Sequence, residues 1–122
     1  MIHASGEDYL ETILLLYKKN GSVRSIDIAR ELGYTKASIS RAMSILKKSD
    51  YILMDSDGQI RLTDKGIIKA NEVYERHQLI TDYLVNALGV SPETASEDAC
   101  RIEHVISEES FEKIREYVKK SE

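Results

Sequence analysis

The stretch that decides the fold is residues 25–49, SIDIARELGYTKASISRAMSILKKS. Its apolar residues recur at helical spacing on both sides of Gly33, and Thr35 is a good N-cap. The pattern predicts one helix over residues 25–32 and a second over about residues 36–49. Two helices joined by a short turn that contains glycine form a helix-turn-helix, although ordinary surface helices also show this spacing.

The segment that follows makes a winged helix the best interpretation. Residues 51–55 and 59–63 are strand-like runs, and the Ser-Asp-Gly sequence at 56–58 has the composition of a hairpin turn. Helix, helix and hairpin in that order predict a winged helix-turn-helix, a fold that binds DNA.

The second helix of this motif has a polar surface suited to DNA. Ile39, Met43 and Leu46 fall on its apolar face. On the remaining surface, small and hydroxyl side chains allow close approach to base edges, while lysine and arginine reach phosphates or guanine. The alternative is an ordinary solvated surface. The predicted DNA-contacting residues, with one from the second strand, are Lys36, Ala37, Ser38, Ser40, Arg41 and Arg61.

Helices are also predicted before and after the winged helix. Ser5 as N-cap and Asp8 near the first turn predict a helix over residues 6–19, and Thr63 caps a long amphipathic run that ends at Gly89. The later helices are predicted over residues 64–88, about 92–107 and 108–120. The last two are too short to bury their apolar faces alone, so packing against a second copy, as a homodimer, is expected.

The predicted fold class is therefore mainly α, with two domains. The first, residues 1–63, is the winged helix-turn-helix DNA-binding domain. The second, residues 64–122, is an all-α metal-binding and dimerisation domain, and the long helix over 64–88 connects the two.

Charge and hydropathy limit the partners of the chain. The net charge of −4 divides into a basic middle, net +3 over residues 22–69, and an acidic part, net −6 over residues 70–122. This asymmetry suits a polyanion on one surface and cations on another. The longest apolar run, residues 13–17, is too short to span a membrane, and residues 1–6 lack signal-peptide features. A cytoplasmic protein with no membrane partner is expected.

A second motif, Cys-Arg-Ile-Glu-His at residues 100–104, carries metal-binding chemistry. If this segment is helical, Cys100, Glu103 and His104 lie on one face. A thiolate, a carboxylate and a neutral imidazole are all ligands for first-row divalent metals, so these residues predict a metal site. Cys100 is the only cysteine, which excludes an intramolecular disulfide and suits a reducing compartment.

Four features together resemble the diphtheria toxin repressor and manganese transport regulator family: residues 5–11, the winged helix-turn-helix, Arg76-His77, and residues 100–107. The resemblance covers nearly the whole chain. It implies a bacterial or archaeal metal-dependent transcriptional repressor that binds palindromic double-stranded operator DNA as a homodimer and controls metal homeostasis genes. It also implies the shorter manganese-type architecture, without an SH3-like domain.

The resemblance implies a set of metal ligands as well. In manganese-type members, metal is held at the positions of Asp8, Glu11, His77, Cys100, Glu103 and His104. Five of these six residues have the same type in manganese-type members. The sixth position, that of Cys100, is a glutamate in those proteins. Iron-type members have cysteine at the position of Cys100 but methionine at that of Asp8, and only His77 survives of their ancillary positions His77, Thr81 and Ser96.

This hybrid pattern bears on the metal. A thiolate is softer than a carboxylate and favours Fe(II), Co(II), Ni(II) or Zn(II) over Mn(II), so Fe(II) is the first choice and Mn(II) the second. The expected main site is formed by Asp8, Cys100, Glu103 and His104. Glu11 and His77 form a weaker second site or an outer shell. The alternatives that involve no metal are a helix-capping role for Asp8 and a surface or partly packed position for His77.

Two other functions fit parts of the sequence. A metal-independent winged-helix regulator that senses a small molecule through the acidic half predicts that substitutions of Cys100, Glu103 and His104 leave DNA binding intact. A metallohydrolase requires a His-Glu-x-x-His pattern or a nucleophile motif, and the sequence has neither. We therefore predict that the protein is not an enzyme.

Overall fold

A computed structural model describes residues 4–121 and divides the chain into two compact units. The N-terminal unit comprises Met1–Asn71 and the C-terminal unit Glu72–Glu122, so the division falls inside α4, the helix predicted to connect the two domains. The functional boundary predicted after residue 63 stays a prediction. Within residues 4–121, no helix combines the length and apolar character needed to cross a membrane.

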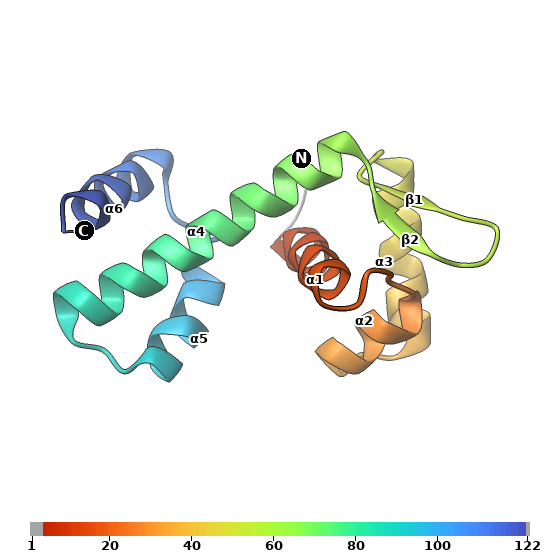
Figure 1. Cartoon of the computed structure of the whole chain (residues 1–122), viewed down its shortest axis with the longest axis horizontal. Helices are drawn as coiled ribbons and strands as arrows, with labels where there is room; N and C mark the ends of the chain where they lie inside the picture. Colours follow the sequence, from red (N-terminus) through yellow and green to blue (C-terminus); the bar gives the residue numbers. More distant parts are fainter. Residues whose placement is uncertain (1–3, 122) are drawn as a thin grey trace. The chain divides into compact units, whose positions relative to one another are not determined.

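The elements of this stretch follow one another mostly as predicted, and the chain is mainly helical (Figure 1). Their bounds are α1 Ala4–Asn20, α2 Ser25–Leu32, α3 Lys36–Lys48, β1 Ile52–Met54, β2 Ile60–Leu62, α4 Asp64–Leu88, α5 Pro92–Ile102 and α6 Glu108–Lys120.

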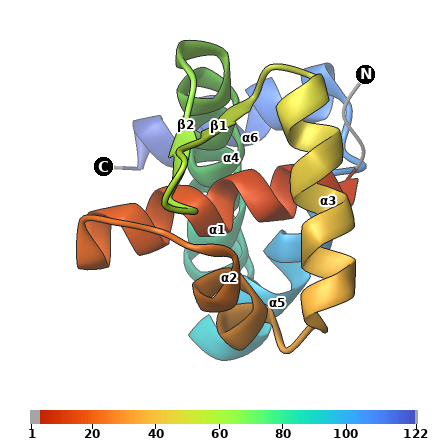
Figure 2. The same cartoon turned by 90° about the vertical axis from the view of Figure 1, so that its right-hand side faces the viewer.

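The N-terminal unit is a winged helix with one apolar core. Helix α1 packs against α2 and β2, and α3 packs against α2 and β1. Figure 2 shows α3 with the hairpin leaving its C-terminal end. The predicted apolar face of α3 is confirmed, because Ile39, Met43 and Leu46 are at most 3% exposed. Every element of the unit contributes to the core, which includes Leu10, Ile13, Ile28, Ile39, Ile52 and Ile60.

The turn of the helix-turn-helix has the predicted chemistry. Gly33 ends α2 in the left-handed conformation, with φ of 71°, where a side chain would be disfavoured. Thr35 then caps α3, because its hydroxyl accepts a hydrogen bond from the amide of Ser38 at 3.2 Å. These two residues set where one helix ends and the next begins.

The wing is a two-stranded antiparallel hairpin extended by a contact that the sequence did not predict. Ile52 pairs with Leu62, and Met54 pairs with Ile60. Beyond this ladder, the amide of Ile60 donates to the carbonyl of Val23 at 2.7 Å. The segment just before α2 therefore lies alongside β2 and ties the wing to the helix-turn-helix.

A tight junction joins the wing to α4. The amide of Thr63 donates to the carbonyl of Tyr51 at 3.0 Å, and its hydroxyl donates to the carbonyl of Asp50 at 2.6 Å. The same hydroxyl accepts from the amide of Gly66 at 3.0 Å, which confirms Thr63 as the N-cap of α4. A Cβ atom on Gly66 would lie only 2.0 Å from the carbonyl oxygen of Tyr51.

In the C-terminal unit, α5 and α6 pack on the later part of α4 (Figure 1). Ile80, Ala99 and Phe111, one from each helix, form the buried centre. Partly buried side chains surround them: Leu79, Leu84, Ile102, Ile106 and Ile114. The amphipathic pattern of α6 is thus satisfied within the unit at Phe111, while Tyr117 remains 48% exposed.

The predicted start of α1 is wrong. The helix begins at Ala4, so Ser5 lies inside it and is not its N-cap. Alanine is the best helix former, which favours extension of the helix past the serine.

The predicted end of α5 is also wrong. The helix stops at Ile102 rather than near Ser107, and a turn follows. The amide of Val105 bonds to the carbonyl of Ile102 at 3.0 Å, which tightens the chain at this point. The turn allows Ile106 to pack on the core shared by the three helices. His104 is therefore in a turn, not on the helical face predicted for it.

The junction predicts a severe effect of Gly66→Ala. The added methyl group meets backbone rather than a flexible side chain, so we expect the free energy of unfolding to fall by about 3 kcal/mol. Urea unfolding followed by circular dichroism measures this. Gly21→Ala is the control, because its φ is +77° but nothing lies within 4 Å of the new Cβ. Gly21→Ala should lower the free energy of unfolding by only about 1–2 kcal/mol. Equal losses in the two variants would contradict the close packing of Gly66 against Tyr51.

Candidate functional site

The C-terminal unit contains a buried carboxylate, that of Glu103. Its side chain is 0% exposed, and it is the charged residue found buried within the described part of the chain. Glu103 is the C-cap of α5, and its amide donates to the carbonyl of Ala99 at 2.9 Å. Burial of a carboxylate is costly unless partners replace the lost water, so the groups around it are informative.

Two imidazoles approach this carboxylate from different sides. Nδ1 of His77, on α4, lies 3.0 Å from Oε2 of Glu103. Nε2 of His104 lies 3.4 Å from Oε1, which is within ion-pair range but without hydrogen-bond geometry. Among the residues that the structure describes, no group makes a hydrogen bond to Oε1.

These distances fit a divalent transition metal. Ligand atoms about 2.1 Å from a tetrahedral metal ion are separated by about 3.4 Å. A carboxylate oxygen without a hydrogen bond and a neighbouring imidazole nitrogen at that separation are suitable donors. The buried, unsatisfied oxygen of Glu103 is the observation that favours a metal here over simple packing.

Two hydroxyl groups contact His77, one at its ring and one at its backbone. Its Nε2 lies 3.2 Å from Oγ of Ser96, and its carbonyl accepts a hydrogen bond from Thr81 Oγ1 at 2.7 Å. These are the positions that the resemblance relates to the ancillary site of iron-type members. The Ser96 hydroxyl orients the imidazole ring, as outer-shell groups commonly do for metal ligands, whereas the Thr81 hydroxyl binds the helix backbone.

The remaining predicted ligands lie on two other helices. Cys100 is exposed on α5, three positions before Glu103. Asp8 and Glu11 are half-buried on α1, three positions apart in the N-terminal unit. Because they belong to a different unit, their joining with the Glu103 cluster is part of the proposal below.

Tyr9, which follows Asp8 on α1, packs against a second tyrosine. The rings of Tyr9 and Tyr34 meet edge to face, with centroids 6.2 Å apart. Burial raises the pKa of Tyr9, and the charges of Tyr34 and Asp8 raise it further. The phenol therefore stays protonated and neutral beside the carboxylate of Asp8.

The predicted DNA-contacting residues of α3 are mostly at the surface. Lys36, Ala37, Ser40 and Arg41 are exposed. Ser38 is half-buried, and its hydroxyl accepts a hydrogen bond from Thr35 Oγ1 at 3.0 Å, so it also serves the N-cap.

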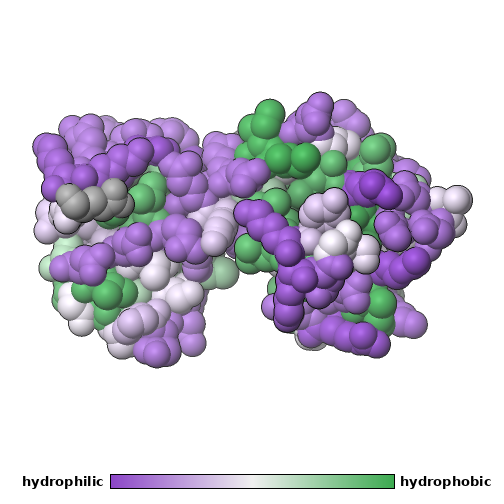
Figure 3. All heavy atoms as spheres, in the orientation of Figure 1, coloured by the Kyte–Doolittle hydropathy of each residue, from purple (hydrophilic) through white to green (hydrophobic). Residues whose placement is uncertain are grey.

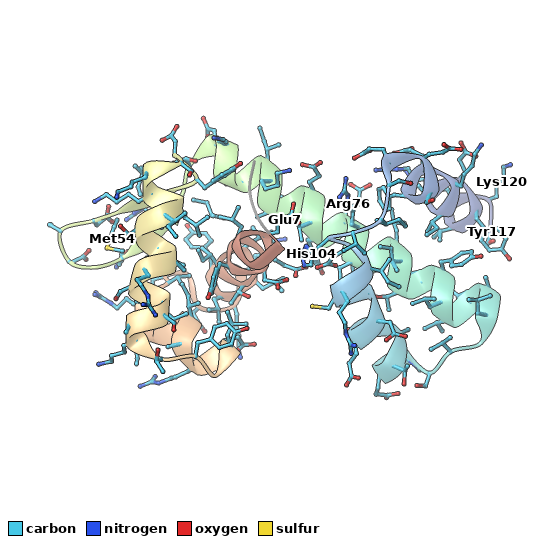
Figure 4. All side chains as sticks on the ribbon, turned by 180° about the vertical axis from the view of Figure 1, so that it is seen from behind. Glu7, Met54, Arg76, His104, Tyr117 and Lys120 are labelled. Carbon is cyan, nitrogen blue, oxygen red and sulfur yellow. The ribbon has the colours of Figure 1, made fainter. Side chains whose placement is uncertain are left out.

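The wing arginine is paired within the wing. Nε of Arg61 donates to Oδ2 of Asp55 at 2.8 Å, and this carboxylate raises the pKa of Arg61. The side chain of Arg61 is 57% exposed, so its other N–H groups stay accessible while Nε binds Asp55. Arg24 also stabilises the hairpin, because its guanidinium donates to the carbonyl of Asp57. Met54, which Figure 4 labels, lies on the first strand of this hairpin. Sequence reasoning missed the role of Arg24, because its partner is more than thirty positions away.

Two concave surfaces of the described residues differ in size. A cavity between α4 and α6, bounded by Tyr83 and Tyr117, has a volume of only about 80 Å³. Sites for drug-sized ligands usually measure about 300–1,000 Å³. A groove of about 380 Å³ lies instead in the N-terminal unit, between α1, β2 and the start of α4. Apolar atoms reach the surface on this unit in Figure 3.

Family models match both parts of the chain. The N-terminal DNA-binding domain of iron-dependent repressors matches residues 1–59, and the metal-binding and dimerisation domain of the same repressors matches residues 63–122. An HTH-type transcriptional regulator of Methanocaldococcus jannaschii is 33% identical over 115 residues, covering 93% of this chain and 92% of the relative. The chain belongs to the iron-dependent repressor family.

Two further relatives agree with this assignment. The transcriptional regulator MntR of Escherichia coli O6:H1 is 35% identical over 114 residues, covering 93% of this chain and 73% of the relative. The solved manganese regulator SloR superposes with a TM-score of 0.83 at 28% identity, covering 93% of this chain. The chain spans about half, 53%, of the SloR chain.

Membership in the iron-dependent repressor family confirms several predictions. The fold is a winged helix-turn-helix followed by a helical metal-binding and dimerisation domain. The family consists of metal-dependent transcriptional regulators rather than enzymes. The choice of metal and the individual site residues remain to be proposed.

Proposed function

We propose that this protein is a metal-activated repressor that binds a palindromic operator as a homodimer and is activated by Fe(II) or Mn(II), with Fe(II) preferred. The observation that carries the proposal is the buried carboxylate of Glu103, with His77 3.0 Å from one oxygen and His104 3.4 Å from the other. Regulation of metal homeostasis genes is the corresponding role.

The proposed ligands form two groups around Glu103. Oε1 faces His104 and belongs to the main site, which Asp8 and Cys100 complete. Oε2 faces His77 and belongs to the second site or outer shell, together with Glu11. The two groups of proposed ligands thus correspond to the two oxygens of the Glu103 carboxylate.

The proposed switch depends on charge. Asp8, Glu11 and Glu103 are three carboxylates, and bringing them together raises their mutual repulsion. A bound divalent cation supplies the positive charge that offsets this repulsion. The ligands of α1 then join those of α5 and fix the placement of α3 for the operator. A change from about 1% to 99% competent protein requires on the order of 10⁴-fold tighter binding to the competent state.

Cys100 and the relatives both bear on the choice of metal. The softness of the thiolate favours Fe(II) over Mn(II). The matching family models describe iron-dependent repressors, whereas SloR is described as a manganese regulator. We therefore place Fe(II) first and Mn(II) second.

Operator binding tests the proposed function directly. Fluorescence anisotropy of a labelled palindromic operator is measured with chelated protein, which is then titrated anaerobically with Fe(II), Mn(II) or Zn(II). We expect at least one metal to tighten DNA binding by two orders of magnitude or more, roughly what a coupling of 3 kcal/mol gives. Equal affinity with and without every metal would favour the small-molecule regulator instead.

The recognition helix predicts a distinct salt effect. Arg41→Ala should weaken operator binding. It should also flatten the slope of the logarithm of the DNA-binding constant against the logarithm of salt concentration by about one per subunit, because a protein with fewer phosphate contacts releases fewer counterions when it binds. Lys120→Ala, at the end of α6, is the control and should leave the slope unchanged. An unaltered slope for Arg41→Ala would mean that this residue does not contact the DNA backbone.

Thermal unfolding tests Glu103 as a ligand. At a metal concentration 100 times Kd, binding stabilises the fold by about 2.7 kcal/mol, which raises Tm by roughly 10 °C. Glu103→Gln should remove most of this increase while leaving the chelated protein at least as stable, because the variant buries no charge. Glu109→Gln, an exposed carboxylate on α6, should retain the full increase. Equal increases in the two variants would exclude Glu103 from the site.

A further inference from the structure

One arginine contacts three parts of the C-terminal unit around the candidate metal site. Arg76 lies on α4, immediately before His77, and its side chain is only 17% exposed. Its Nη1 lies 3.4 Å from the carbonyl oxygen of Glu103, and its Nη2 donates to Oε1 of Glu108 at 2.5 Å. Figure 4 marks Arg76 on α4 and His104 in the turn after α5.

The contact with Glu103 is at a helix end. The last carbonyl groups of an α-helix have no partner within the helix, and the helix dipole makes this end negative. Glu103 is the C-cap of α5, so its carbonyl is one of these groups. The guanidinium of Arg76 supplies both a donor and a positive charge there, from a different helix.

Packing keeps the guanidinium in this position. Its central carbon lies 5.4 Å from the centroid of the Phe111 ring, and that ring is 3% exposed. Arg115 stands over the same ring at 5.1 Å and pairs with Glu75. The two arginines thus share Phe111 and each has a carboxylate partner, but of the two only Arg76 contacts Glu103.

We propose that Arg76 is a positioning residue for the metal site: it caps α5 from outside and holds the turn that carries Glu103 and His104 in place. The inference rests on the proposed function. It assigns α6 a part in the site as well, because Glu108 and Phe111, both on α6, fix the side chain of Arg76. Groups of this kind outside the ligand set typically change metal affinity about 10–100-fold when removed.

Arg115→Gln provides a matched control for Arg76→Gln. Both substitutions remove ion pairing and a cation–π contact to Phe111. Arg76→Gln loses the ion pair with Glu108, and Arg115→Gln loses those with Glu75 and Glu112. Of the two, only Arg76→Gln removes the contact with Glu103. Affinity for Co(II), followed by its visible ligand-field absorption, should fall about 10–100-fold in Arg76→Gln and less than about threefold in Arg115→Gln. Equal losses in the two variants would overturn the inference.

Hydrogen exchange in the metal-free protein gives a second readout. The amides of Val105 and Ile106 both donate to the carbonyl of Ile102 at 3.0 Å. Arg76→Gln should accelerate their exchange relative to Arg115→Gln, while exchange in the middle of α6 stays the same in both. Uniform acceleration across the unit would indicate general destabilisation and contradict a positioning role. If wild-type protein binds no Co(II), the proposed function fails, whereas binding with equal variant affinities rejects only the role of Arg76.

Discussion

The arrangement of the C-terminal unit depends on the burial of one carboxylate. Glu103 is removed from water at the end of α5, so its charge and its carbonyl group both require partners within the protein. His77 and His104 approach the two carboxylate oxygens, and Arg76 approaches the carbonyl. These groups come from α4, from the turn after α5 and, through the partners of Arg76, from α6. The packing of three helices is therefore coordinated around a polar group rather than around apolar side chains alone.

The N-terminal unit shows a different principle, in which the backbone sets the geometry. Thr63 uses its amide and its hydroxyl to join the end of the wing, the loop after α3 and the first turn of α4. Gly66 permits this because a side chain would overlap the carbonyl of Tyr51. The bond between Ile60 and Val23 anchors the other side of the hairpin. The hairpin is therefore anchored to the rest of the N-terminal unit on both sides.

Most helix and strand positions could be predicted because their ends carry local signals. Gly33 and Thr35 act through atoms within four positions of themselves, and so does Thr63 in its bond to the amide of Gly66, so these helix ends are readable from sequence. The end of α5 carries no glycine or proline, and the helix stops there because Ile106 must reach a core shared with α4 and α6. Contacts of Glu103 with Arg76 and His77 join positions 27 and 26 apart. Residue types predicted a metal site, but only packing shows which groups surround the predicted ligand Glu103.

Cys100 changes what Glu103 is required to do. A glutamate at position 100 would offer two oxygens and could bridge two cations, whereas a thiolate offers one sulfur atom and favours softer metals. With that carboxylate absent, Glu103 is the carboxylate of the C-terminal cluster whose two oxygens face different histidines. Any communication between a main and a second metal position would then pass through this one side chain. The burial that makes Glu103 costly to the metal-free protein also keeps its two oxygens in fixed directions.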